Sequence, residues 1–176
     1  MTYQYRELFR ELQLAVDDRP GGAIASFEVN ARSAAGLSST ASARRFEIDV
    51  DQPRALGGGD AAPGPAEYLL AALAASQQST YRYYADALNV PLDAVGVHVE
   101  GDIDLRGLFA VDPMIRPGFG DIVVTVELTS SATEADLRRL KAAVDSHCPI
   151  LDTLRNSVPV HLGLEFRAVP DRAVSE

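Results

Sequence analysis

The sequence predicts an α+β fold in which a mainly antiparallel sheet packs on one long central helix. Residues 64–88 form a long, mostly apolar segment with no internal helix breaker, and residues 95–105 and 121–128 each alternate apolar with polar side chains. Along the chain, strands, one helix, strands, two helices and a strand follow one another. That order indicates helices packed on one face of an antiparallel sheet. At 176 residues the chain suits one domain.

The N-terminal third predicts one helix and two strands. Residues 3–16 carry an apolar stripe at helical spacing, and the Pro-Gly-Gly that follows ends this amphipathic helix. Residues 26–32 and 44–50 are expected to be strands. The Ser- and Ala-rich residues 33–43 between them are expected to be a connection.

The centre of the chain predicts a loop and the long helix. Residues 52–65 read as a Gly/Pro-rich connecting loop. The alternative is a phosphate cradle at the helix start, but the loop has no Lys and its Asp60 would repel an anion. Pro65 suits the first turn of the helix, and Asn89 with Pro91 ends it. Because residues 64–88 are apolar on nearly all sides, this helix is expected in the core or in a subunit interface.

The C-terminal half predicts two antiparallel strands, two helices and a last strand. The alternating residues 95–105 and 121–128 form the strand pair, joined by the Gly/Pro-rich residues 107–118. The first helix covers residues 131–144, with Ser131 or Thr133 as N-cap, and a short helix begins near Cys148. Residues 158–169 are expected to be the closing strand, with Val160, Leu162, Leu164 and Phe166 pointing inward.

Composition excludes several classes of function. With 25 acidic against 16 basic residues the net charge is −9, which argues against nucleic acid as a partner. The one basic cluster, residues 137–141, is expected on a solvated helix face. No apolar run approaches the ~20 residues of a membrane span, and no secretory signal is recognisable, so the cytoplasm is the expected location. Three histidines and one cysteine show no zinc spacing, so neither a metal nor another cofactor is expected.

Cys148 is the most informative single residue. Placed at a helix start beside Pro149, its sulfur would meet unpaired backbone N–H groups, which favour a reactive thiolate; the alternative is an inert, buried cysteine. His147 is adjacent in sequence, but neighbours in sequence need not touch in space. Glu67 is explained by the dipole at the start of the long helix, and the tyrosines of residues 81–84 indicate packing or, alternatively, a ligand pocket.

Three ordered motifs resemble the OsmC/Ohr hydroperoxide-resistance family. They are "LGGGDAAPGPAEYLLAALAAS" followed by "YRYYAD", then "RPGFGDIVVTVEL", then "HCPILDTLRNSVPV". The resemblance runs from about Phe27 to Phe166. It implies an OsmC-like domain at residues 23–170, preceded by an N-terminal helical extension at residues 1–22. The tail at residues 171–176 is expected to be frayed, as chain ends commonly are.

The resemblance also implies an intertwined α+β homodimer with two sites at the subunit interface. Peroxidase members use one cysteine on the central helix to attack the peroxide and a second, in the His-Cys-Pro segment, to resolve the sulfenic acid. Carried over to this chain, the second cysteine is Cys148, whereas Ser76 stands at the position of the first. A serine hydroxyl is a weak nucleophile and forms no sulfenic acid, so a two-cysteine mechanism is excluded.

The residues that activate the first cysteine depart from the family pattern as well. The family's Glu directly follows the helix-entry Pro, where this chain has Ala66, and the acid stands one position later at Glu67. The family's Arg corresponds to Arg32, with Arg44 or Arg45 as rival assignments.

The resemblance therefore implies a divergent member of a hydroperoxide-detoxifying, oxidative-stress family. The first interpretation is single-cysteine thiol chemistry at Cys148, acting on an organic hydroperoxide and recharged by a dithiol reductant. The second is a non-catalytic dimer that binds a small apolar ligand in a pocket lined by Ser76, Gln77 and nearby Tyr side chains. The third is a scaffold without a small-molecule site.

Overall fold

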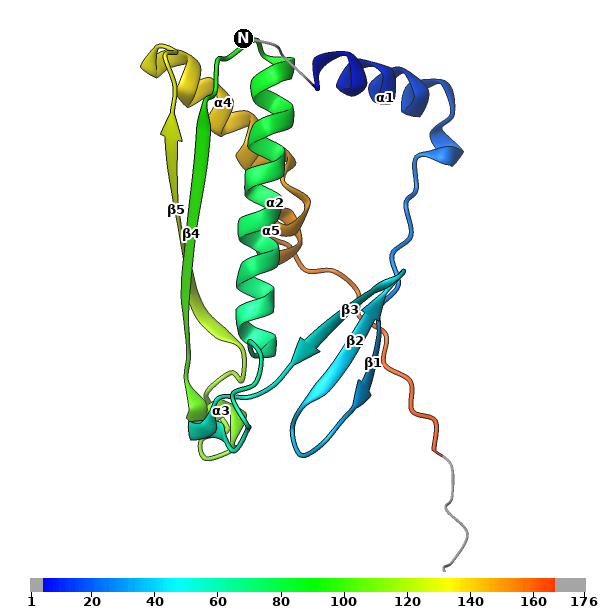
Figure 1. Cartoon of the computed structure of the whole chain (residues 1–176), viewed down its shortest axis with the longest axis vertical. Coiled ribbons are helices and arrows are strands. Elements are labelled where there is room, and N and C mark those ends of the chain that lie inside the picture. Colours follow the sequence, from blue (N-terminus) through cyan, green and yellow to red (C-terminus); the bar gives the residue numbers. More distant parts are fainter. Residues whose placement is uncertain (1–4, 167–176) are drawn as a thin grey trace, which may run out of the picture.

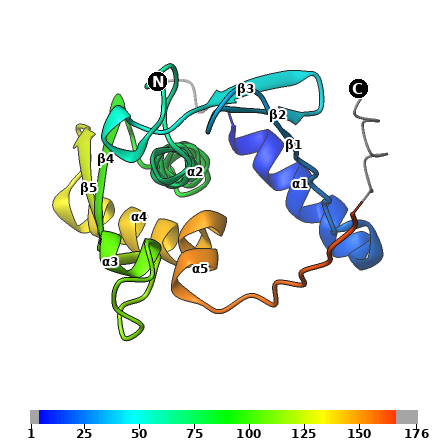
Figure 2. The ribbon, with the colours of Figure 1, turned by 90° about the horizontal axis from the view of Figure 1, so that it is seen from below.

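The structure of the chain is a computed structural model that describes residues 5–166, apart from the side chain of Pro20. One long helix, α2 (Pro65–Ala87), stands at the centre, with a two-stranded sheet on one side and α4 and α5 on another (Figures 1 and 2). A second, three-stranded sheet lies beside the start of α2, where the Tyr68 hydroxyl donates to the Asp49 carbonyl oxygen at 2.7 Å (Figure 1). The other elements are α1 (Arg6–Asp18), η1 (Pro20–Gly22), β1 (Asn30–Ser33), β2 (Ser39–Ala43), β3 (Phe46–Val50), η2 (Arg54–Leu56), β4 (Ala94–Ile103), α3 (Leu105–Leu108), β5 (Phe119–Thr129), α4 (Glu134–His147) and α5 (Pro149–Arg155).

The central helix begins and ends where the sequence predicts. Pro65 occupies the first turn, and the Glu67 carboxylate accepts the Gly64 backbone N–H at 2.6 Å, which closes the N-terminal end. Asn89, with φ +58°, lies beyond the last turn. The residues of α2 buried against its neighbours recur every three or four positions, as one helix face requires. They are Leu73, Gln77, Thr80, Tyr81 and Ala85.

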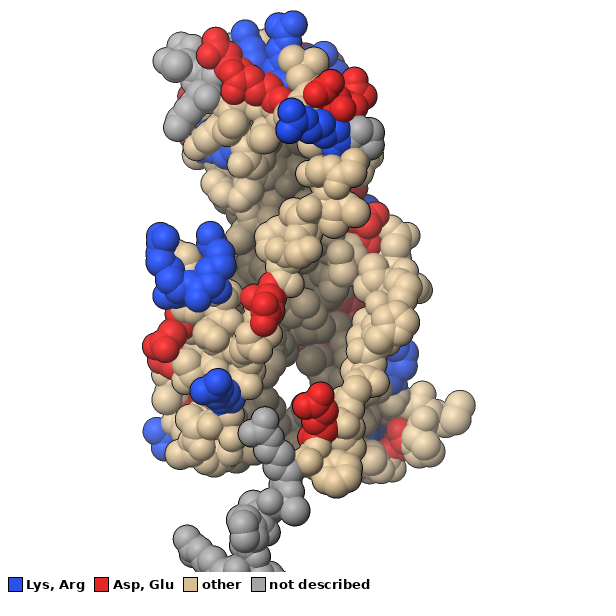
Figure 3. Space-filling view, turned by 90° about the vertical axis from the view of Figure 1, so that its right-hand side faces the viewer, with Lys and Arg blue, Asp and Glu red and all other residues tan. Residues whose placement is uncertain are grey.

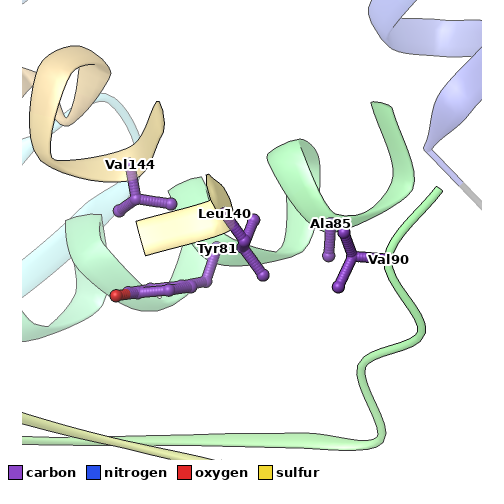
Figure 4. Packing of buried hydrophobic residues seen from close by; sticks show 5 residues of the cluster. All are labelled: Tyr81, Ala85, Val90, Leu140 and Val144. Carbon is purple, nitrogen blue, oxygen red and sulfur yellow. The ribbon is translucent and has the colours of Figure 1, made fainter. Parts of the chain in front are cut away.

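β4 and β5 form the predicted antiparallel pair. Val97 lies opposite Val126 and Val99 opposite Val124, and these side chains are half-buried while His98 between them is exposed. The half-buried face packs against α2, and α4 and α5 also contact α2. Figure 4 shows the centre of this packing, where α2, α4 and the connection that follows α2 supply side chains. The cluster contains Tyr81, Ala85, Val90, Leu140 and Val144.

The strands do not form one sheet. β1, β2 and β3 make a separate antiparallel sheet in that order, and β4 with β5 makes another. Residues 33–43, predicted as a connection, contain the middle strand β2, which pairs with both neighbours. The prediction missed β2 because its residues, Ser39–Ala43, are small and carry no apolar alternation.

The predicted closing strand is not formed in residues 158–166, and the rest of that segment, with the tail at residues 171–176, lies outside the described residues. The four side chains expected to point inward are 74–93% exposed: Val160, Leu162, Leu164 and Phe166. A strand needs a neighbouring edge to pair its backbone groups, and in the described chain this segment has no such partner.

The predicted N-terminal helix is present as α1, and it contacts the C-terminal half of α2. The Tyr5 backbone N–H donates to the Asp86 carboxylate at 2.7 Å, and the ring of Phe9 meets that of Tyr84 edge-on at 5.3 Å. Within residues 5–166, no helix has the length and apolar character that crossing a bilayer requires.

Candidate functional site

The structure brings Ser76 and Cys148 together. The Ser76 Oγ and the Cys148 Sγ lie 3.2 Å apart, and either can be the donor. Ser76 is half-buried on the middle of α2, whereas Cys148 lies between α4 and α5 and is 1% exposed. Seventy-two positions of sequence separate the two residues, so only the packing of α5 on α2 makes this contact.

The surroundings of the thiol are apolar. Cys148 forms a buried cluster with Leu73 of α2 and Leu151 of α5. Half-buried aliphatic side chains from β4, β5 and α5 pack around that cluster: Val99, Ile122, Val124 and Ile150. The Ser76 hydroxyl is therefore the polar side chain that meets the sulfur in this part of the chain.

His147 does not direct its ring toward the sulfur. Its Nδ1 lies 2.7 Å from the carbonyl oxygen of Ala143, one turn back in α4. The ring also lies against that of Tyr84, with 5.0 Å between centroids. Adjacency in the sequence therefore does not make His147 a base for Cys148.

A cavity of about 700 Å³ lies beside Ser76. Its walls come from α1, α2 and the junction of α4 with α5, and Figure 3 shows the hollowed face of the molecule on the side of α1. The lining residues are Phe9, Leu12, Gln13, Val16, Ala75, Ser76, Ser79, Thr80, Tyr83, Tyr84, His147 and Pro149. Ser79 and Thr80 were not predicted from the sequence as lining residues. They stand three and four positions after Ser76, and this spacing places them on the same face of the helix.

Gln77 lines a different cavity, of about 840 Å³, together with Tyr81 and side chains of β5, α4 and α5. In the single chain, Ser76 and Gln77 therefore line separate cavities, whereas the pocket expected in the dimer contains both. Successive helix residues point about 100° apart, so neighbours in sequence face different spaces. Gln77 is 2% exposed, and its Nε2 has no hydrogen-bond partner among the described residues. Burial and the charge of Asp145 raise the pKa of Tyr81 to about 12, so this phenol stays neutral.

The other predicted residues lie away from the pair. Glu67 bonds to the Gly64 backbone at the start of α2, nine positions from Ser76. Arg32 is exposed on β1, opposite Thr40 of β2. Arg44 and Arg45 lie over the ring of Phe46 at the turn between β2 and β3, with 5.1 and 4.8 Å to the centroid. No described residue of this set contacts Ser76 or Cys148 in the single chain.

The Gly-rich loop before α2 is organised by a carboxylate of its own. Asp51 is buried and accepts the backbone N–H groups of Gln52, Gly59 and Ala61 at 2.8, 3.0 and 3.1 Å. These bonds, the one from Ala61 first, hold the pKa of Asp51 below its usual range. A side chain at Gly58 would meet the Gln52 carbonyl oxygen at 1.8 Å, so the close turn needs glycine. The loop N–H groups are thus already occupied, which favours the connecting-loop interpretation over a phosphate cradle.

Comparison with known proteins gives one consistent answer. The model of the OsmC-like protein family matches residues 57–163, which is more than half of the chain. No curated protein matches significantly.

Within residues 5–166, no cluster of three or more His, Cys, Asp or Glu could hold a metal ion.

Three similar solved structures are all from bacteria. An OsmC-like protein from Mycoplasma pneumoniae has a TM-score of 0.67 at 22% identity, covering 76% of this chain and 89% of its own. An organic hydroperoxide resistance protein OsmC from Legionella pneumophila has a TM-score of 0.60 at 21% identity, covering 76% and 91%. The organic hydroperoxide resistance protein OhrB of Bacillus subtilis has a TM-score of 0.53 at 21% identity, covering 80% and 98%. At these identities the likeness shows the fold.

Proposed function

Because the chain belongs to the OsmC-like protein family, we propose that it reduces organic hydroperoxides with Cys148 as its single reactive thiol. The observation that supports this proposal is the 3.2 Å contact between Ser76 Oγ and Cys148 Sγ. The two positions that resemble the family's cysteine pair meet in space, although one of them carries a hydroxyl. Two structural neighbours are named organic hydroperoxide resistance proteins. A chain with one cysteine suits the reducing cytoplasm.

The chemistry needs one thiolate and an external reductant. The Cys148 thiolate attacks the terminal oxygen of ROOH, and the O–O bond breaks. The electron pair leaves on the alkoxide, which takes a proton and departs as ROH, while the sulfur becomes a sulfenic acid. One thiol of a dithiol then displaces water to form a mixed disulfide. Its second thiol closes the dithiol's own disulfide and releases Cys148 as a thiol.

Ser76 has a positioning role in this scheme. Its hydroxyl donates a hydrogen bond to the thiolate, which stabilises the charged form of a sulfur otherwise surrounded by apolar side chains. It cannot form a disulfide, so the sulfenic acid waits for an external thiol.

The working protein is proposed to be an intertwined homodimer. Two extended segments expose large apolar side chains that a second copy would cover: Ile24 and Phe27 are 83% and 93% exposed, and Leu162 is 93% exposed. Such exposure is unusual for a monomer. The exposed Arg32 on β1, or its rivals at the β2–β3 turn, would then be available to the site of the second copy. Gel filtration with light scattering tests the dimer directly.

A second candidate function is non-catalytic binding of a small apolar ligand. It is favoured by the burial of Cys148, which is 1% exposed, and by the engagement of Glu67 in closing the start of α2. In this case Ser76 would hold the polar end of the ligand without turnover.

The test is consumption of cumene hydroperoxide with dithiothreitol, by the protein and by the Cys148→Ser and Ser76→Ala variants. The proposal expects turnover that disappears in Cys148→Ser and falls about tenfold or more in Ser76→Ala, since a hydrogen bond to a charged group contributes about 1.5–3 kcal/mol. Turnover equal in the protein and in Cys148→Ser would exclude thiol chemistry and favour the binding function.

A further inference from the structure

The N-terminal helix α1 forms a wall of the cavity beside Ser76. It lies outside residues 57–163, the part that the family model matches. Its first turns are fixed to α2: the Tyr5 N–H donates to the Asp86 carboxylate at 2.7 Å, and the Arg6 Nε–H donates to the Asp86 carbonyl oxygen at 3.4 Å. The rings of Tyr5 and Phe9 meet those of Tyr83 and Tyr84, with 5.5 and 5.3 Å between centroids. This arrangement places the apolar stripe of α1 over the face of α2 that carries Ser76.

The lining of the cavity is mostly apolar. Phe9, Leu12 and Val16 line it from α1, and no Asp, Glu, Lys or Arg is among the described residues that line it. The hydroxyls of Ser79 and Thr80 donate to carbonyl oxygens of their own helix, at 2.9 and 2.7 Å. Gln13, Tyr83, Tyr84 and His147 also line the cavity, and the Ser76 hydroxyl is the lining group that contacts the thiol.

We propose that α1 is the specificity element of this site. Its apolar side chains admit an uncharged, apolar ligand to Ser76 and disfavour an anionic one, because a carboxylate or sulfonate would lose its hydration with no Lys or Arg in the described lining to pair with. This inference rests on the proposed function for the role of the Ser76–Cys148 pair. It concerns binding, however, and holds for catalytic and non-catalytic ligands alike.

The test uses two fluorescent probes with the same ring skeleton. N-phenyl-1-naphthylamine is uncharged, and 8-anilino-1-naphthalenesulfonate adds one negative charge. Each is titrated into the full-length protein and into three variants. Leu12→Lys places a cation in the cavity wall, and Ala75→Phe fills the cavity from α2. Leu14→Lys is the matched control, since Leu14 is on the same helix, similarly exposed, and does not line the cavity.

The protein should bind the uncharged probe more tightly. Leu12→Lys should shift the ratio of the two Kd values by about three- to tenfold toward the sulfonate, the effect of one partly exposed charge a few ångströms away. Ala75→Phe should remove most binding of the uncharged probe, while Leu14→Lys leaves the ratio unchanged. The inference is overturned if the protein does not bind the uncharged probe, or if Leu12→Lys and Leu14→Lys give the same ratio. If the unmodified protein binds the probes as expected but does not turn over hydroperoxide, the proposed function is refuted and this inference stands.

Discussion

Replacing Ser76 by Cys should create a disulfide with Cys148. The two side-chain atoms are already 3.2 Å apart, and an S–S bond needs about 2.05 Å, so the thiols must approach by roughly 1 Å. The bond would close a loop of 72 residues. In the chain-entropy description, such a cross-link stabilises the folded protein by about 4.4 kcal/mol at 25 °C. For a domain of this size that corresponds to a rise of about 9–18 °C in Tm, and the strain of the approach favours the lower end.

The assay follows oxidation of Ser76→Cys by one equivalent of hydroperoxide. We expect loss of both titratable thiols, a monomer mass lower by about two hydrogens, and a Tm that falls by about 10 °C when reductant is added. Ser79→Cys is the control, because Ser79 lies in the same cavity but bonds to the Ala75 carbonyl and not to Cys148. If two free thiols persist in oxidised Ser76→Cys, or if Ser79→Cys behaves identically, the contact between α2 and α5 is not as described.

Three further changes test the fold around the site. Asp51→Asn should destabilise the protein at pH 7. Because the folded pKa of Asp51 lies below its ordinary value of 3.8, the stability that Asp51 contributes is complete above about pH 4 and is lost as the pH falls further, so urea midpoints of the two proteins should converge below pH 4. Gln77→Met should leave the urea midpoint unchanged or raise stability by about 1 kcal/mol, since a buried amide N–H without a partner costs about 1–3 kcal/mol; a clear loss would reveal a partner for that group. Thr133→Ala should cost about 1 kcal/mol because its hydroxyl accepts the Asp136 N–H at the start of α4, whereas Ser131→Ala should have no effect; equal losses in thermal unfolding would contradict this assignment.

The local sequence pattern was sufficient to predict the helices and strands that turn one apolar face toward the core. The start and end of α2, the β4–β5 pair and the start of α5 at Cys148 were all predicted, because caps, helix breakers and periodic apolar residues act over a few positions. The strand β2 was missed because its small residues become a strand only through pairing with β1 and β3. Residues 158–166 have the alternation of a strand, yet alternation does not specify which edge a segment pairs with, and these residues pair with no strand of the described chain.

The sequence by itself predicted the α+β class and the OsmC-like family, and its resemblance to that family implies that Ser76 stands at the position of a reactive cysteine. Only the tertiary structure decided that Ser76 touches Cys148, because their contact depends on how α5 packs against α2 across 72 positions of sequence. It also decided that Ser76 and Gln77 face different cavities and that α1 covers one of them. Helix geometry sets the directions of neighbouring side chains, but the packing of the other helices determines what those side chains meet.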